Sequence, residues 1–154
     1  KKTKVVVGEN TANNIPEKVV VTESFKEKLV GKIIGIILYL DEIKEDASKY
    51  KKEFENIAGK SFEEAVESLG EAKKAEKIFE AEYTYKENNI GEKIIKTNLQ
   101  EFILVYEKHS LEEKINEWTD SLRMESGEND ELMNKVSSAS RRVQEIKDIL
   151  QKEV

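Results

Sequence analysis

The sequence predicts an all-α protein: a single-domain bundle of about five helices, mostly antiparallel, behind an extended N-terminal arm. Three observations predict it. The length of 154 residues fits one domain of ordinary size. The chain contains a single proline, and its charged residues are mainly Glu and Lys, which lose little side-chain freedom in helices. Apolar residues recur every three or four positions over most of the chain, which is the period of an amphipathic helix.

The first 23 residues differ in character from the rest of the chain. Two runs of valine, at 5–7 and 19–21, flank a stretch rich in Gly and Asn, and Pro16 lies between them. Because β-branched runs, glycine and proline disfavour a helix, we expect residues 1–23 to form an extended arm. The arm either tethers the domain or folds back on it, and the helical bundle occupies residues 24–154.

The pattern predicts one long first helix over 24–58. Ser24 and Glu27 have the spacing of a capping box, in which each side chain bonds the backbone N–H of the other. Apolar residues then follow at spacings of four and three to the end of the segment, which is a heptad pattern. The middle of this segment is apolar on more than one face, so we expect a central helix. Gly31 and Gly35 would allow another helix to approach closely.

A second helical region follows a glycine stop. Gly59 stands where a left-handed helix cap is expected, and Ser61 with Glu64 forms a second capping box. Gly70 indicates a kink in this region. Residues 79–85 alternate between apolar and polar, which is the period of a strand, but the sequence offers no strand partner apart from the valine arm. We therefore predict a helix there.

The rest of the chain is predicted to form three more helices. Asn89, three residues before Glu92, indicates a cap at the start of the first. The apolar stripe changes phase at His109 and Ser110, and Ser110 has an acidic residue three positions later. This combination predicts a break near these two residues, with Ser110 as the next cap. A loop near 125–129 precedes the last helix, which has a regular heptad pattern.

Composition argues against catalysis, metals and cofactors. The chain has no cysteine and one histidine, so Cys-based and multi-His metal sites are excluded, and so is a di-iron bundle site. No glycine-rich phosphate loop is present, and His109 lacks a neighbouring nucleophile. We therefore expect no enzyme activity, a surface or capping role for His109, and a core position for Trp118. A net charge of −6 and only three arginines argue against nucleic-acid binding.

Two groups of residues are candidates for contact with a partner. Tyr83 and Tyr85 are difficult to bury together beside Lys86, so these three are expected to form an exposed patch. Arg141 and Arg142 are two of only three arginines, and we expect them on the outer side of the last helix. Aromatic residues and arginine are enriched at protein interfaces.

The sequence contains no apolar run of the ~18 residues needed to span a membrane. Its basic start is followed by only three valines, so these residues do not themselves form a signal peptide. The protein is therefore expected either to be cytosolic or to follow an export leader.

A cysteine-free helical domain rich in Lys, Glu, Ile and Asn, behind a polar arm, resembles the helical outer-surface lipoproteins of pathogenic spirochaetes. The resemblance implies a lipid anchor on the outer membrane, ahead of this sequence, and binding of a host protein. That protein would be a complement component or another plasma or matrix protein. The alternative is an intracellular or phage-encoded helical assembly or adaptor protein, because the heptad patterns could extend into an oligomer. The sequence leaves the oligomeric state open.

Overall fold

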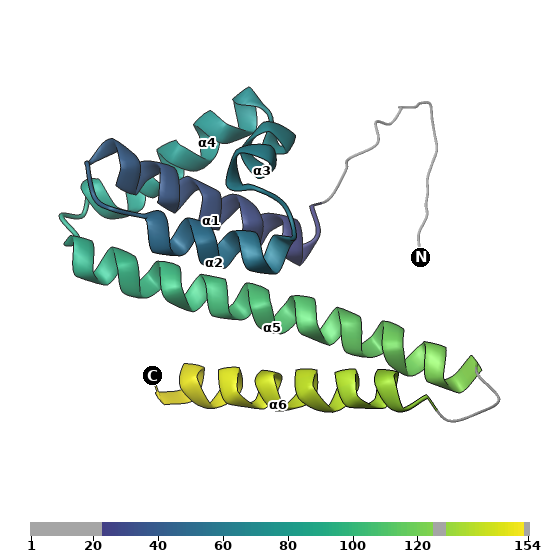
Figure 1. The fold of residues 1–154 in the computed structure, drawn as a ribbon. Helices are drawn as coiled ribbons and strands as arrows, with labels where there is room; N and C mark the ends of the chain where they lie inside the picture. Colours follow the sequence, from purple (N-terminus) through teal and green to yellow (C-terminus); the bar gives the residue numbers. More distant parts are fainter. Residues whose placement is uncertain (1–22, 125–128, 153–154) are drawn as a thin grey trace, which may run out of the picture.

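A computed structural model describes residues 23–124 and 129–152 and confirms the all-α prediction. The described residues form six α-helices and one π-helical turn, η1, and contain no strand (Figure 1). The elements are α1 (Phe25–Glu42), α2 (Ser48–Ala58), α3 (Phe62–Leu69), α4 (Glu71–Ala81), η1 (Glu82–Lys86), α5 (Glu92–Met124) and α6 (Asp130–Lys152). Residues 1–22 of the arm expected at 1–23 lie outside the described residues.

Helix α1 is the centre of the bundle, as its apolar sequence predicts. It packs against α4 on one side and α5 on another, and α2 packs against α5. Gly35 explains the close approach of α4, because a Cβ atom on Gly35 would lie 2.5 Å from the backbone oxygen of Lys77. The core consists of buried residues from α1 to α5: Leu29, Ile33, Ile34, Ile36, Ile37, Tyr39, Leu40, Ala47, Tyr50, Phe54, Phe62, Ala65, Ala81, Tyr85, Ile95, Leu99, Ile103 and Tyr106.

The prediction of one long helix over 24–58 is wrong. The capping box of Ser24 and Glu27 is present, but α1 ends at Glu42 and α2 runs back along it (Figure 1). Lys44 adopts a left-handed conformation with φ of 66°, and the carboxylate of Asp46 accepts hydrogen bonds from the N–H and hydroxyl of Ser48. The heptad spacing continues across this turn because both helices face the same core.

The second helical region follows the prediction closely. Gly59 is left-handed with φ of 75° and ends α2, and Ser61 and Glu64 form the expected capping box of α3. Gly70, with φ of 89°, separates α3 from α4. Residues 79–85 are helical, as predicted, but the last turn is a π-helix.

The predicted break near residues 109–110 is absent, because α5 is continuous from Glu92 to Met124. Ser110 lies inside this helix, and its buried hydroxyl has no hydrogen-bond partner in the structure. Asn89 is not a helix cap either: it has a left-handed φ of 55°, and α5 begins after Gly91. The phase change in the apolar stripe instead accompanies a change of neighbours: α5 packs against α1, α2 and α6, and α1 and α2 lie beside only its first part (Figure 1).

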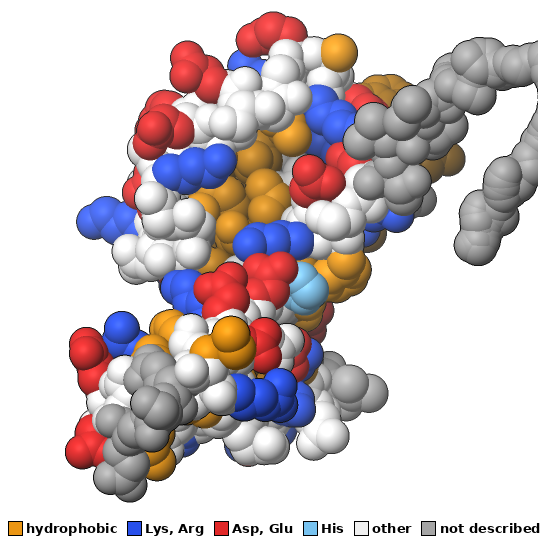
Figure 2. Space-filling model, turned by 90° about the vertical axis from the view of Figure 1, so that its right-hand side faces the viewer, with side chains coloured by type: hydrophobic (Ala, Val, Ile, Leu, Met, Phe, Trp, Pro, Cys, Tyr) orange, Lys and Arg blue, Asp and Glu red, His pale blue; other side chains and the backbone are white. Residues whose placement is uncertain are grey.

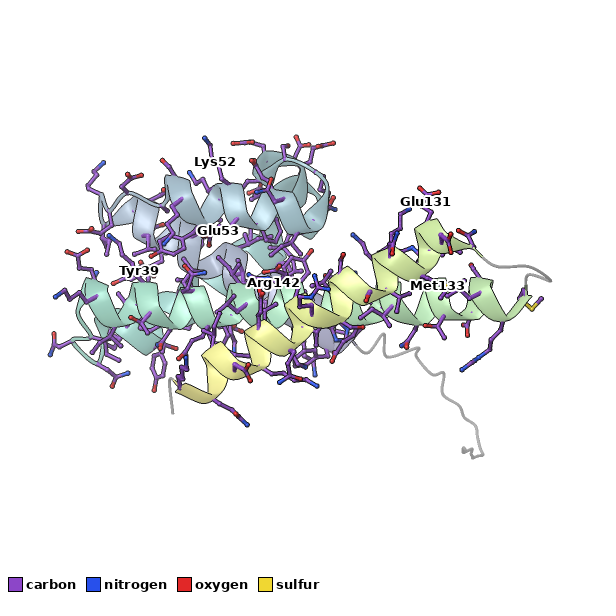
Figure 3. The ribbon with its side chains drawn as sticks, turned by 60° about the horizontal axis from the view of Figure 1, so that its bottom comes forward. Tyr39, Lys52, Glu53, Glu131, Met133 and Arg142 are labelled. Carbon is purple, nitrogen blue, oxygen red and sulfur yellow. The ribbon has the colours of Figure 1, made fainter. Side chains whose placement is uncertain are left out.

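Helices α5 and α6 form a hairpin that extends beyond the other helices (Figure 1). Residues 125–128 of the expected loop lie outside the described residues. Asn129 begins α6, because its side-chain oxygen accepts a hydrogen bond from the N–H of Leu132 at 3.0 Å. Helix α6 packs chiefly against α5 and crosses it at an angle, with Arg142 near the crossing (Figure 3).

Candidate protein-binding groove

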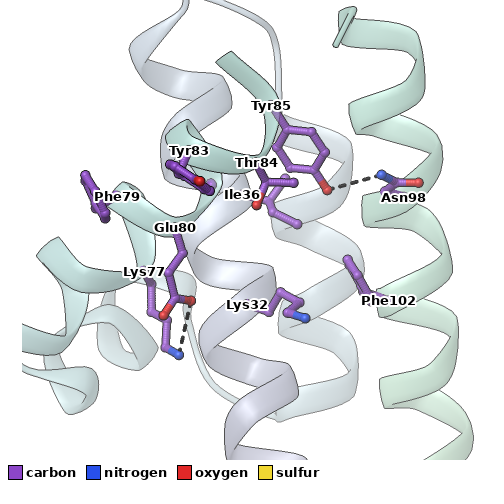
Figure 4. Close-up of a pocket in the computed structure, with 11 residues that line it drawn as sticks. Lys32, Ile36, Lys77, Phe79, Glu80, Tyr83, Thr84, Tyr85, Asn98 and Phe102 are labelled. Atoms are coloured by element: carbon purple, nitrogen blue, oxygen red, sulfur yellow. Dashed lines mark hydrogen bonds and ion pairs between the residues drawn. The ribbon is translucent and has the colours of Figure 1, made fainter. Parts of the chain in front are cut away.

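The most prominent exposed aromatic residues are Phe79, near the end of α4, and Tyr83, in η1. They are four residues apart, and each is 64% exposed. Their rings stack with centroids 6.4 Å apart and planes inclined by 28°. Both residues line a cavity, and Figure 4 shows Tyr83 nearer its middle and Phe79 at its outer edge, farther from α5. Such a pair offers a large and rigid apolar contact surface without rearrangement.

The cavity beside this pair is a groove of about 460 Å³ between α1, the α4–η1 segment and α5. Ile36 of α1 and the ring of Tyr85 lie at its floor, and Asn98 and Phe102 of α5 form the wall opposite Phe79 (Figure 4). We call this site the aromatic groove. Its lining residues are Lys32, Ile36, Lys77, Phe79, Glu80, Ala81, Tyr83, Thr84, Tyr85, Asn98 and Phe102.

Two lysines and one glutamate supply the charge of the aromatic groove. Lys77 is largely buried and forms an ion pair with Glu80, with Nζ and Oε1 3.5 Å apart. Lys32 is exposed, and its ammonium lies 5.2 Å from the centroid of the Phe102 ring. It forms no ion pair within the part of the chain that the structure describes. The groove therefore presents one uncompensated positive charge beside an apolar surface.

The two tyrosines of the π-helical turn η1 face different ways, Tyr85 toward the core and Tyr83 toward solvent. The N–H of Glu87 donates to the carbonyl oxygen of Glu82, five residues earlier, at 3.2 Å. Tyr85 turns inward, where its ring stacks on Tyr39 at 6.4 Å and its hydroxyl accepts a hydrogen bond from the side chain of Asn98 at 3.2 Å. π-helical turns are rare and occur often at functional sites.

The structure separates the predicted patch of Tyr83, Tyr85 and Lys86. Tyr83 is exposed as expected, but the expectation for Tyr85 is wrong, because it is only 4% exposed. Lys86 is exposed and does not line the aromatic groove. The physical reason is helical spacing: Ala81 and Tyr85 are four apart and share a buried face, whereas Phe79 and Tyr83 are four apart and share an exposed one.

The arginine pair lies elsewhere, on α6. Arg141 is exposed as predicted. The prediction that Arg142 lies on the outer side of α6 is wrong. Its guanidinium donates two hydrogen bonds, of 2.8 and 2.9 Å, to the carboxylate of Glu107 on α5. Arg142 therefore joins two helices, and its part in binding a partner stays a prediction.

Trp118 lines a second, shallower cavity of about 520 Å³ between α5 and α6. The tryptophan is partly exposed rather than a full member of the core, and the ammonium of Lys135 lies 5.8 Å from its ring centroid. Of the described elements, only α5 and α6 form this part of the hairpin, and the two together leave the ring partly exposed.

A third hollow opens at the end of the molecule drawn in Figure 2, where apolar side chains lie below a rim of charged ones. The cavity at this end, between α1, α2 and α3, measures about 440 Å³. Two of the three lysines that line it are already paired: Lys26 with Glu113 and Lys73 with Glu23, each at 2.9 Å. The third, Lys60, forms no ion pair among the described residues, so this hollow and the aromatic groove each keep one lysine without an acidic partner there.

His109 lies in the middle of α5, not at a helix end as predicted. Its ring meets the edge of Phe25 at a centroid distance of 5.4 Å, and its Nε2 lies 3.6 Å from a carboxylate oxygen of Glu113. Across the described ranges, no three His, Asp or Glu side chains are placed to share a metal ion. Within the same ranges, none of the helices combines the length and apolar character that a membrane span requires.

Sequence reasoning missed most of the aromatic groove. It found Tyr83 but not Phe79, Lys32 or Phe102. The spacing of four between Phe79 and Tyr83 was an available clue, because residues four apart are neighbours on a helix. Lys32 and Phe102 come from helices far apart in sequence, and no local pattern could join them. Comparisons of the chain with protein-family models, curated proteins and solved structures found no match.

Proposed function

We propose that the chain is a non-enzymatic protein of a bacterial surface that binds a host protein, such as a complement component or another plasma or matrix protein. The observation that carries the binding role is the stacked, exposed pair of Phe79 and Tyr83 on the rim of the aromatic groove. Exposed aromatic residues beside a pocket are typical of the anchors that dominate binding energy at protein interfaces.

Two further features support this proposal. Large apolar side chains on a surface cost solubility unless they have a contact to make. The resemblance to spirochaetal surface lipoproteins supplies the expectation of a host partner and of a lipid anchor on the outer membrane. In this proposal the bundle is a rigid scaffold, and binding needs no reaction chemistry.

A serum pull-down with the immobilised chain tests the proposal. We expect the chain to retain a specific serum protein, and the double variant Phe79→Ala with Tyr83→Ala to lose it. Phe25→Ala is the matched control, since Phe25 is 58% exposed but contacts His109, away from the groove. Absence of any retained protein at micromolar concentration would contradict the host-binding role.

The α5–α6 hairpin favours a second candidate function, a helical assembly or adaptor protein. Trp118 is partly exposed there and Met133 is 48% exposed, so two hairpins could cover each other's apolar sides. Light scattering distinguishes the two functions. A monomer at high concentration would contradict assembly, and a defined oligomer dissociated by Trp118→Ala would favour it.

A further inference from the structure

The spacing of the residues that line the aromatic groove matches the repeat of a helix bound in it. Its three sides each carry residues four positions apart: Phe79 and Tyr83 on one wall, Asn98 and Phe102 on the other, and Lys32 and Ile36 along the floor. Residues four apart on a helix are about 6 Å apart along its axis. The side chains of an added helix repeat at the same distance, so they can fill the spaces between these rows.

The α5 wall continues beyond the cavity. Ile94 lies one turn before Asn98 on the same face of α5, and it is 56% exposed. Together with Phe102, these residues extend over two turns of α5. A partner helix of several turns would therefore meet an apolar or neutral wall along its length.

Lys32 determines the charge that such a helix must carry. Its ammonium lies 5.2 Å from the centroid of the Phe102 ring and has no acidic partner among the described residues. An apolar helix laid over it would remove water from an unpaired charge, which is unfavourable. Lys77 needs no such partner, because Glu80 already compensates it.

We propose that the aromatic groove binds an amphipathic helix of a protein partner whose apolar face carries one carboxylate opposite Lys32. This inference rests on the proposed binding function and names the feature of the partner that the groove recognises. The apolar residues of the helix contact Phe79, Tyr83 and Phe102, and its carboxylate pairs with Lys32. A second copy of this chain is a poorer occupant, since each copy carries a net charge of −6 and copies repel one another.

A displayed library of 18-residue helices tests the proposal on the full chain. The library fixes Leu at positions of one helical face and randomises all others, and it is counter-selected on the Phe79→Ala, Tyr83→Ala double variant. We expect enriched sequences to share Asp or Glu at one position beside the leucines. Lack of enrichment over the double variant, or enrichment without an acidic preference, would overturn the proposal.

Charge reversal gives the decisive measurement. Lys32→Glu is expected to weaken an enriched peptide by about tenfold or more, and replacing the peptide's acid by Lys is expected to restore binding to this variant. The matched control is Lys114→Glu, on the exposed side of α5. Equal effects of the two variants would overturn the role of Lys32.

Two other occupants of the aromatic groove, a second copy of the chain and the chain's own arm, would give different results in these experiments. If the chain is a dimer that Lys32→Glu dissociates, a second copy fills the groove and the proposal fails. If peptides bind only after the valines at 19–21 are replaced by Ser, the chain's own arm fills it and the proposal also fails. The serum pull-down remains independent: a retained serum protein that is insensitive to Lys32→Glu would refute this inference and leave the host-binding function standing.

Discussion

Arg142 on α6 holds Glu107 on α5 in a two-pronged contact, with Nε 2.8 Å from one carboxylate oxygen and Nη2 2.9 Å from the other. Its third contact is to Glu145, one turn along α6, at 3.2 Å. The hydrogen bonds that Arg142 donates to Glu107, and then to Glu145, raise the pKa of Arg142 above its already high ordinary value. Figure 3 places Arg142 near the point where α6 crosses α5. The contact therefore fixes α6 in register on its only extensive neighbour among the described elements.

Arg142→Lys is expected to loosen α6. Lysine keeps the charge but cannot reproduce the planar two-pronged geometry, so we expect a loss of about 1 kcal/mol. Hydrogen exchange of the α6 amides measures it. Arg141→Lys is the matched control, because Arg141 is exposed, and its effect should stay within about 0.5 kcal/mol. Equal effects at both positions would show that Glu107 does not hold α6.

Ser110→Ala is expected to leave stability unchanged or to raise it by up to about 1 kcal/mol. The buried hydroxyl of Ser110 has no hydrogen-bond partner among the described residues, and alanine is the better helix former in the interior of α5. Ser61→Ala should instead cost about 1 kcal/mol, because Ser61 caps α3. Urea unfolding measures both. A clear loss from Ser110→Ala would mean that its hydroxyl has a partner in solution.

Gly35→Ala is expected to cost about 1–3 kcal/mol of unfolding free energy. The added methyl group would meet the backbone of Lys77 and push α4 away from α1. Gly31→Ala makes a matched comparison, since its methyl group would meet only the flexible end of the Lys77 side chain, at 3.0 Å. We expect little loss there. Thermal melts of the two variants that coincide would contradict the close approach of α4 at Gly35.

The ion pair of Lys26 and Glu113 makes part of the stability depend on pH. The hydrogen bond from Lys26 lowers the pKa of Glu113 below its ordinary value of 4.5. The contribution of this ion pair to the free energy of unfolding is therefore present above pH 4.5 and is lost as the pH falls through the lowered pKa of Glu113. Because both side chains are about half exposed, we expect Lys26→Gln to cost only about 0.5 kcal/mol at neutral pH.

Urea unfolding at neutral pH and at acid pH checks this pH dependence. The difference between the parent chain and Lys26→Gln should shrink once Glu113 is protonated. Lys114→Gln, an exposed lysine on the same helix, should show no such change. A difference that persists in acid would mean that Lys26 stabilises the fold by packing rather than by charge.

Local sequence patterns located those helix ends that are determined by residues close in sequence. The capping boxes at Ser24 and Ser61 and the left-handed Gly59 are all present, because each needs only residues within one turn. The same reasoning failed at Asn89 and Ser110. The spacing there fits a cap, but packing against other helices decides where α5 begins and whether it breaks.

The candidate site was only partly predictable for the same reason. The spacing of four between Phe79 and Tyr83 places them together on any helix, whichever helix packs beside it. Tyr85 faces the core, where it contacts Tyr39 and Asn98, and these two residues come from α1 and α5. Arg142 likewise appeared free until α6 was placed against Glu107.

The sequence by itself determined that this chain is helical, where several helices are capped, and which segment lies at the centre, because these properties follow from spacing and propensity along the chain. Only the tertiary structure decided that the first heptad pattern turns back at Lys44, that α5 is unbroken, and that Lys32 and Phe102 meet Phe79 across one groove. The physical reason is that a periodic pattern specifies which face of a helix is apolar, but not which other helix that face will meet.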